Sequence, residues 1–474
     1  MAWDDSGDIV VVLPGIAGSV LQRDGKDVFG LTVSAGLRAL FSGGASIREL
    51  AVDLEHPEKD DGVTAHRLAP DAHLVPGLWK IDGYGRIVDW LVDRLHLQPG
   101  VDLREFPYDW RQDNRLAATR LRDEAEHWLR ERRRTYPDAR LVLLAHSMGG
   151  LVARYYLEVL GGWRDTRRLL TFGTPHRGAL DALDYLVNGC RKAFGLVDLT
   201  ALMSTFPSTY QLLPIYPCVS VDGASPVRLT ELLEPIPGLD PHRVAAADDF
   251  HREIERAVAR NRADAEYHER GYALHLVVGA EHPTRQSAQW SGRELTVHRD
   301  YPEGVDRTDM GGDGTVPRVS ATPIELSDVG AEWFAGDKHA ALQNAEAVLR
   351  QFRRTLLTPS LRMARFRATA PVTVALDVAD VYPQGEPPVI RVLPLAPPDE
   401  NELTDRRALA DLVIDVEAVI GEGEPWTTAV ELVDDWREVE LPVLEPGCYR
   451  VRISGERGVQ PTTDLLVVAP PERH

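Results

Sequence analysis

The segment that most constrains the fold of this chain is residues 141–156, LVLLAHSMGGLVARYY. Its first part is a continuous apolar run, typical of a strand buried on both faces of a sheet, and its second part has the pattern of a helix. Between them Ser147 occupies a sharp turn of the nucleophile-elbow kind, with the small residues Ala145 and Gly149 two positions away on either side. We expect the Ser147 hydroxyl to project at the carboxyl end of the sheet, facing the amino end of the helix. An ordinary strand–loop–helix connection with an incidental serine is the alternative.

The segments around this turn alternate between apolar strands and helices. This alternation predicts a parallel sheet covered by helices on both faces, which is the α/β class. After an interruption the sheet is expected to resume at 273–279 and 321–326, and a helix near 340–356 closes the unit. The predicted strands are 8–14, 103–110, 140–145 and 167–173, and the predicted helices are 83–95, 113–134 and 148–160.

Residues 180–270 interrupt the alternation with loops and helical segments, among them a polar helix near 248–267. We interpret this region as a cap inserted into the catalytic unit. Its stretch 194–206, FGLVDLTALMSTF, is dense in apolar residues. That stretch either forms a lid or acyl-chain wall over the site or forms the core of the cap, and the sequence leaves both interpretations open.

The composition changes after residue 360. Short segments rich in Val, Ile and Thr, separated by Pro and Gly at about ten-residue spacing, predict a β-sandwich of the immunoglobulin or fibronectin kind. Residues 361–474 contain 11 Lys and Arg and 21 Asp and Glu, so this part carries a charge of −10, which is half of the net charge of −20. We therefore divide the chain into a catalytic domain at 1–360 and an acidic β module at 365–474. An independent module is expected to make few contacts with the rest, so that a chain ending near residue 360 keeps activity on a short ester.

Charge and composition argue against several other classes of function. The 474 residues include 53 Lys and Arg and 73 Asp and Glu, so the basic footprint of a nucleic-acid-binding protein is missing. No apolar run reaches the ~18–20 residues of a membrane span. The three cysteines lack zinc-site spacing, and a Cys190–Cys218 disulfide is left open. The start, MAWDDSGDIVVVLPG, lacks the basic residues of a signal peptide, and we expect a cytoplasmic protein.

A serine hydroxyl becomes an effective nucleophile when a histidine base, held by an acid, takes its proton. In α/β-hydrolases these residues follow the chain order serine, acid, histidine. Asp313 lies in the glycine-rich turn GGDGTVP, where the DxDxDG spacing of a calcium loop is absent. His339 follows on a loop, GDKHAALQNAEAVL, just before a helix. We therefore predict a catalytic triad of Ser147, Asp313 and His339, against the alternatives of a plain Asx turn and a surface histidine.

The end of the first strand, VVLPGIAGS, is expected to bring backbone amides beside the nucleophile. An oxyanion hole needs two N–H donors, and we assign them to Ile16 and Met148. A turn at Ile16 without catalytic contact is the alternative. The nearby His146 and His176 are expected to be packed or hydrogen-bonded neighbours. This chemistry implies no metal and no organic cofactor.

Six motifs and the late His339 occur together in the order PGIAGS, YDWR, AHSMGGLVARYY, TFGTPHRGA, PSTYQLLP, GGDGTVP and His339. In this combination the chain resembles the lecithin:cholesterol acyltransferase family, which includes phospholipid:diacylglycerol acyltransferases and lysosomal phospholipase A2-like enzymes. The resemblance covers roughly residues 8–355, and generic α/β-hydrolases do not share YDWR or GDGTVP. It implies an acyl-enzyme at Ser147, a triad completed by Asp313 and His339, a lipid acyl donor, and transfer to an alcohol or to water.

The sequence therefore predicts an α/β-hydrolase with an inserted cap and a carboxyl-terminal β-sandwich, acting as a serine lipid acyl hydrolase or acyltransferase. A soluble carboxylesterase or lactonase is the alternative enzyme, distinguished by acyl-chain length preference. A catalytically idle scaffold whose β module binds a protein partner is the alternative of another class. The expected partner is a lipid or other acyl-ester substrate, with transient membrane-surface contact and a basic protein partner left open. Asp109 and Arg111 of YDWR are expected to form a structural pair beside the site.

Overall fold

The structure, a computed structural model, covers most of the chain. Among the residues it describes, no helix combines the length and the apolar character needed to cross a membrane. The described residues are 7–29, 50–53, 61–70, 73–75, 79–81, 83–192, 197–280, 282–300, 311–326, 332–357, 373–395, 412–421, 423–430, 436–455 and 461–470.

A six-stranded sheet in the order β16-β13-β9-β8-β1-β7 forms the centre of the molecule. Every neighbouring pair of its strands is parallel. All residues of β1 and β8 are buried, in agreement with their unbroken apolar sequences. The strands are β1 (Ile9–Leu13), β7 (Leu103–Glu105), β8 (Leu141–His146), β9 (Thr166–Phe172), β13 (Ala273–Gly279) and β16 (Glu332–Ala335).

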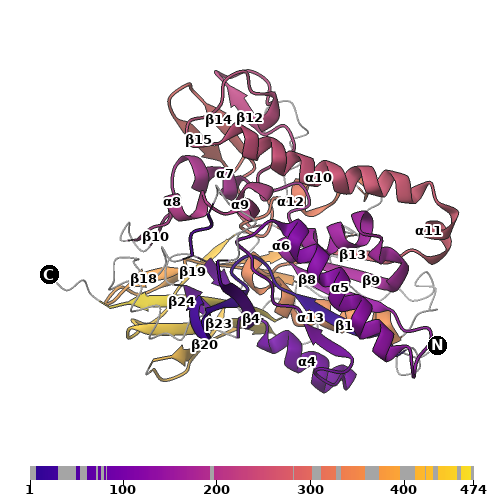
Figure 1. Ribbon diagram of the computed structural model, residues 1–474. Helices are drawn as coiled ribbons and strands as arrows, with labels where there is room; N and C mark the ends of the chain where they lie inside the picture. Colours follow the sequence, from indigo (N-terminus) through magenta and orange to yellow (C-terminus); the bar gives the residue numbers. More distant parts are fainter. Residues whose placement is uncertain are drawn as a thin grey trace, which may run out of the picture.

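Helices cover both faces of this sheet, with α5 and α6 on one face and α4 and α13 on the other (Figure 1). Helix α4 buries the side chains of Ile87, Leu91 and Leu95, which recur at helical spacing. Helix α6 continues without a break into the π-helical turn η1. The predicted α/β class, a parallel sheet covered by helices on both faces, is confirmed. The elements are α4 (Gly85–Leu95), α5 (Asn114–Arg132), α6 (Met148–Arg154), η1 (Tyr155–Val159) and α13 (Glu346–Leu357).

One predicted strand is wrong. Residues 321–326 do not join the sheet, because α12 (Arg318–Ala321) and the 3₁₀ turn η4 (Ile324–Leu326) occupy that segment. The edge of the sheet is formed by β16 instead, which pairs with β13. Pro323 accounts for the difference, since a proline inside the run cannot donate a hydrogen bond to a strand ladder.

Between β1 and α4 the chain forms a small antiparallel sheet, β3-β2-β4, and the hairpin β5-β6. Ser19, the first residue of β2, binds the YDWR segment: its Oγ accepts from the Tyr108 N–H at 3.0 Å and its carbonyl accepts from the Trp110 indole at 3.1 Å. This pairing fixes YDWR beside the loop that follows β1. The strands are β2 (Ser19–Arg23), β3 (Lys26–Phe29), β4 (Val63–Leu68), β5 (His73–Val75) and β6 (Trp79–Ile81).

The cap has a hydrophobic core of its own, which includes Leu183, Tyr210 and Trp290. It extends beyond residue 270, because β12 pairs with β14 and β14 with β15. Its cysteines Cys190 and Cys218 are buried, and the disulfide left open by the sequence is not formed. The elements are α7 (Leu180–Val187), β10 (Arg191–Lys192), β11 (Val197–Asp198), α8 (Thr200–Met203), α9 (Pro207–Gln211), β12 (Val219–Val221), η3 (Leu229–Glu231), α10 (Pro241–Arg262), α11 (Ala265–Arg270), β14 (Ser287–Trp290) and β15 (Leu295–His298).

The carboxyl-terminal region forms two sheets, β17-β19-β22 and β18-β24-β23-β20-β21, as predicted for a β module. Their apolar faces share one core, which includes Val374, Ile390, Ile414 and Val451. The strands are β17 (Thr373–Val378), β18 (Val381–Pro383), β19 (Val389–Leu395), β20 (Leu412–Ile420), β21 (Trp426–Val430), β22 (Arg437–Glu440), β23 (Gly447–Gly455) and β24 (Thr462–Ala469).

Candidate active site

The turn between β8 and α6 holds Ser147 in a strained backbone conformation, with φ 52° and ψ −127°. A positive φ is costly for a residue with a side chain, and here neighbouring strands maintain it: the Ser147 N–H donates to the Phe172 carbonyl of β9 at 2.8 Å. The two glycines that follow have no room for a side chain. A Cβ on Gly149 would lie 2.4 Å from the Pro14 carbonyl oxygen, and one on Gly150 would lie 2.0 Å from Thr174 Oγ1. The geometry is that of a nucleophile elbow.

The three residues predicted as a triad lie in direct hydrogen-bond contact. His339 Nε2 is 2.8 Å from Ser147 Oγ, and His339 Nδ1 is 2.7 Å from Asp313 Oδ2. Because the carboxylate can only accept, Nδ1 carries the proton and Nε2 is free to accept from the serine. His339 begins the 3₁₀ turn η5 (His339–Asn344), so its side chain approaches Ser147 from the loop after β16.

Asp313 is held on both carboxylate oxygens. Its Oδ1 accepts from the N–H groups of Thr315 at 3.0 Å and Val316 at 2.6 Å, while Oδ2 faces His339. The Asp313 carbonyl also accepts from the His339 N–H at 2.9 Å. The side chain is buried, and the glycines of GGDGTVP let the backbone fold around it. Asp313 and His339 are therefore fixed to each other by side chain and by backbone.

Gly173, in the TFGTP motif at the end of β9, explains how these residues come so close. Its φ is +53°, and a Cβ there would lie 2.6 Å from Asp313 Oδ2 and 2.9 Å from His339 Nδ1. Any side chain at this position would occupy the space of the acid–base pair. The motif is visible in the sequence, but the purpose of its glycine depends on contacts with Asp313 and His339, which lie far along the chain.

A second, buried series of hydrogen bonds runs behind the triad. The Gly15 N–H donates to Tyr84 Oη at 2.7 Å, and Tyr84 Oη is 2.8 Å from His146 Nδ1. His146 Nε2 lies 2.8 Å from the His339 carbonyl oxygen, which can only accept. The proton of His146 is therefore on Nε2, and the Tyr84 hydroxyl donates to Nδ1. This series ties the loop after β1 to the His339 loop, and His146 is the hydrogen-bonded neighbour that was predicted.

The two adjacent histidines differ in their electrostatic surroundings. Burial, with a smaller contribution from the charge of His339, lowers the pKa of His146 to about 3. His146 is thus a neutral hydrogen-bonding group at physiological pH. His176 is also buried, and burial lowers its pKa well below the usual value.

The two residues assigned to the oxyanion hole flank Ser147. Gly15, next to Ile16, packs so closely that a Cβ on it would lie 2.7 Å from Ser147 Cβ. Met148 is the first residue of α6, where helix N–H groups have no partner within the helix. Within the described part of the chain, the N–H groups of Ile16 and Met148 have no hydrogen-bond partner. Their use by a developing oxyanion stays a prediction.

The triad opens into a cleft of about 340 Å³. This is within the size range of small-molecule sites in proteins. The cap contributes the apolar residues Ala179, Ala182, Met203 and Leu212 to its wall. The β module contributes Asp377, Asp380, Arg391 and Asp464. A wall from the module was not predicted, because nothing in the local sequence signals it.

Among its described residues, the apolar stretch 194–206 contributes to the cleft and to the main core, and not to the core of the cap. Met203 lies on the wall of the cleft, whereas Phe206 belongs to the main core, where its ring meets Trp110 edge-on at 5.7 Å between centroids. Phe194 and Leu196 lie outside the described residues. Met203 is therefore a wall residue of the cleft and Phe206 a residue of the main core, and contact with an acyl chain stays a prediction.

Asp109 and Arg111 of YDWR form the structural pair that was predicted. The carboxylate of Asp109 accepts from Arg111 Nε at 2.9 Å and from Nη2 at 2.6 Å. Arg111 is fully buried and also binds Asp61 at 2.9 Å and the Leu50 carbonyl at 3.0 Å. Burial alone would lower the pKa of Arg111, but the hydrogen bonds and charges of the two carboxylates raise it. The guanidinium joins three separate segments beside the site.

The family model of lecithin:cholesterol acyltransferase matches residues 78–230. The chain resembles this family. The matched region includes YDWR and Ser147, whereas Asp313 and His339 lie beyond it.

Among curated proteins, the uncharacterized protein YJR098C of Saccharomyces cerevisiae is 26% identical over 156 residues, which are 33% of this chain and 22% of that protein. The match thus spans about a fifth of that relative's length. Among solved structures, the mature form of Bacillus licheniformis lipase BlEst2 is 11% identical with a TM-score of 0.31, covering 74% of this chain and 93% of that chain. Its propeptide form gives the same identity and TM-score and covers 98% of this chain and 94% of that chain.

Proposed function

We propose that this protein is a serine acyl hydrolase or acyltransferase that acts on a lipid ester through an acyl-enzyme. The observation that carries the proposal is the pair of contacts that joins Ser147 Oγ to His339 at 2.8 Å and His339 to Asp313 at 2.7 Å. A serine so placed can lose its proton as it attacks a carbonyl. The match to the lecithin:cholesterol acyltransferase family and the apolar cap residues of the cleft support a lipid ester as substrate.

In the proposed reaction, Ser147 Oγ bonds to the carbonyl carbon of the ester while His339 Nε2 takes its proton. The N–H groups of Ile16 and Met148 stabilise the negative charge on the carbonyl oxygen. The bond between carbon and the leaving oxygen then breaks, and His339 returns the proton to the departing alcohol. Water or another alcohol attacks the acyl-enzyme, gives its proton to His339, and releases Ser147 with that proton. Asp313 keeps Nδ1 protonated and stabilises the cation that forms on His339.

The proposal is tested with a fluorophosphonate probe and the variant Ser147→Ala. We expect the wild-type protein to be labelled at Ser147, and the variant to lose labelling and at least ~1,000-fold of its ester turnover while it stays folded. Ser291→Ala is the matched control, because Ser291 is exposed on the cap hairpin away from the cleft lining, and it should keep both properties. A wild-type protein that is not labelled would contradict the proposal and favour the idle scaffold.

A panel of phospholipids and triacylglycerols, with and without a long-chain alcohol, identifies the acyl donor and acceptor. Mass spectrometry of the products separates free fatty acid from an ester of the added alcohol. Free acid alone indicates a hydrolase, and a new ester indicates an acyltransferase. Turnover restricted to short, soluble esters would support the carboxylesterase alternative instead.

A further inference from the structure

The residue before the histidine of the triad is anchored in the β module. Lys338 Nζ donates to the Val378 carbonyl of β17 at 2.7 Å, and it lies 2.8 Å from Asp377 Oδ1 and 3.5 Å from Asp464 Oδ2. These contacts join two strands of the module, β17 and β24, to the loop that carries His339. The sequence pattern predicts few contacts between the module and the catalytic domain and does not signal this one.

This anchor is a charged group in a largely buried setting. Only 19% of the Lys338 side chain and 3% of the Asp464 side chain are exposed. Burial alone would lower the pKa of Lys338, but the charges of Asp464 and Asp377 raise it, so the ammonium stays protonated. Asp377 also binds Arg391 of the module. Removing one member of such a set leaves a buried charge without compensation.

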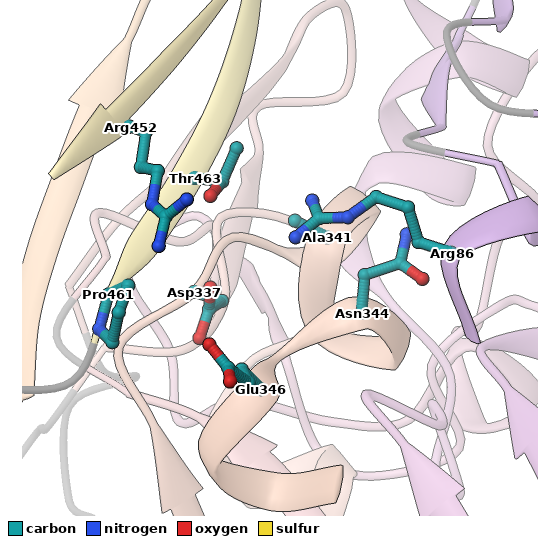
Figure 2. A pocket seen from close by; sticks show the side chains of 8 residues that line it. All are labelled: Arg86, Asp337, Ala341, Asn344, Glu346, Arg452, Pro461 and Thr463. Carbon is teal, nitrogen blue, oxygen red and sulfur yellow. The ribbon is translucent and has the colours of Figure 1, made fainter. Parts of the chain in front are cut away.

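Residues of the module and residues around His339 also line one small pocket together. Figure 2 shows Arg452 and Thr463 of the module around a small pocket, opposite Asp337 and Ala341 of the His339 loop. Residues on both sides of His339 therefore face the module. The other fixed points of His339 are its contacts to Asp313 and, through its carbonyl, to His146.

We propose that the β module holds His339 in line with Ser147 through Lys338, so that Lys338 and Asp377 are positioning residues for acyl transfer. The inference rests on the proposed function. His339 must keep its Nε2 within hydrogen-bond distance of Ser147 Oγ, and a displacement of about 1 Å in such a pair can cost ~100-fold in rate. Lys338 controls that position because it is covalently next to His339 and its ammonium is bound from three directions.

The test compares variants of the full-length chain by the rate of fluorophosphonate acylation and by kcat and KM on a short ester, per folded molecule. Lys338→Met should lower the acylation rate and kcat by about 10- to 100-fold with little change in KM. Lys338→Arg should restore most of the rate, since it can bind the same carboxylates. Asp377→Asn should act in the same direction, and the double variant Lys338→Met with Asp377→Asn should lose less than the product of the two single effects.

Glu417→Gln is the matched control, because it removes a carboxylate that pairs with Arg450 elsewhere in the module, and it should leave the rates unchanged. If Lys338→Met is folded and reacts at the wild-type rate, the inference about Lys338 is overturned and the proposed function still stands. If Lys338→Met does not fold, wild-type rates in Asp377→Asn would overturn it. A wild-type protein that does not react with the probe would overturn the proposed function and this inference with it.

Discussion

The ring centroids of His146 and His339 are 5.1 Å apart, but the two side chains have different surroundings. His339 faces Ser147 and the cleft, and Asp313 binds its other nitrogen. His146 is enclosed, and both of its ring nitrogens have partners in Tyr84 and the His339 carbonyl. A proton on Nδ1 of a charged His146 would leave the Tyr84 hydroxyl, which donates to that nitrogen, without its acceptor. His146 is therefore built to stay neutral.

This difference predicts an acid-sensitive contribution of His146 to stability. Its pKa is about 3 in the folded protein, below the ordinary value of 6.5, so the unfolded chain takes up the proton first as the pH falls. The stabilisation is complete above about pH 6.5 and is lost progressively as the pH falls towards 3. Between about pH 7.5 and about pH 5 the linked loss is on the order of 2 kcal/mol in the free energy of unfolding.

Urea unfolding of the wild-type protein and of His146→Gln at these two pH values measures the effect. The glutamine does not titrate, so the stability advantage of the wild-type protein should be smaller at the lower pH. Other buried histidines, such as His176 and His251, are present in both proteins and cancel in the comparison. A constant difference between the two proteins at both pH values would refute the prediction.

At the scale of elements, the sequence was enough to predict the features that depend on a few consecutive residues. The buried strands β1 and β8, the strained turn at Ser147 and the acid turn at Asp313 each follow from a few consecutive residues. Tyr84 could not be predicted, because its importance depends on contacts with Gly15 and His146, which are distant in the sequence. The strand expected at 321–326 is absent because Pro323, inside the apolar run, cannot donate a hydrogen bond to a strand ladder.

The cap helix α8 contains Met203, which leads to a prediction about the preferred length of the substrate acyl chain. Met203 lines the cleft, and each substrate methylene buried there contributes at most about 0.8 kcal/mol. An octanoyl ester should therefore exceed an acetyl ester by at least ~100-fold in kcat/KM, even with incomplete burial. Met203→Gln, which keeps the side-chain size and adds polar atoms, should lower the octanoyl value several-fold and spare the acetyl value.

Leu202→Gln provides the comparison for this prediction. Leu202 is the neighbour of Met203 in α8, but it packs against the main core and not on the cleft wall. It should change stability without changing the ratio of octanoyl to acetyl kcat/KM. Equal losses on both esters in Met203→Gln would assign Met203 to packing alone and remove this support for a long acyl chain.

At the scale of the whole molecule, composition was enough to recognise the β module but not to place it. Alternating Val, Ile and Thr between turns is a local property, so the strands could be predicted from the sequence. The position of the module depends on Lys338 meeting Asp377 and Asp464, and no local pattern marks a lysine that pairs with carboxylates far along the chain. These contacts could therefore not be predicted from the sequence, and a shortened chain tests whether the module is independent.

The sequence predicts that a chain ending near residue 360 keeps its activity, whereas the contacts of the module with Lys338 predict a slower chain. A chain ending at Leu357, the last residue of α13, keeps the triad but removes the carboxylates bound to Lys338 and one wall of the cleft. We expect it to react with the fluorophosphonate probe at least ~10-fold more slowly than the full chain, since His339 loses part of its support.

The rate is measured per folded molecule, with circular dichroism and a thermal scan as the folding controls. Because the central sheet and its core lie within the retained residues, a folded but slow chain would separate the role of the module in catalysis from a role in folding. Acylation at the full rate would instead show that the catalytic domain does not need the module for this reaction.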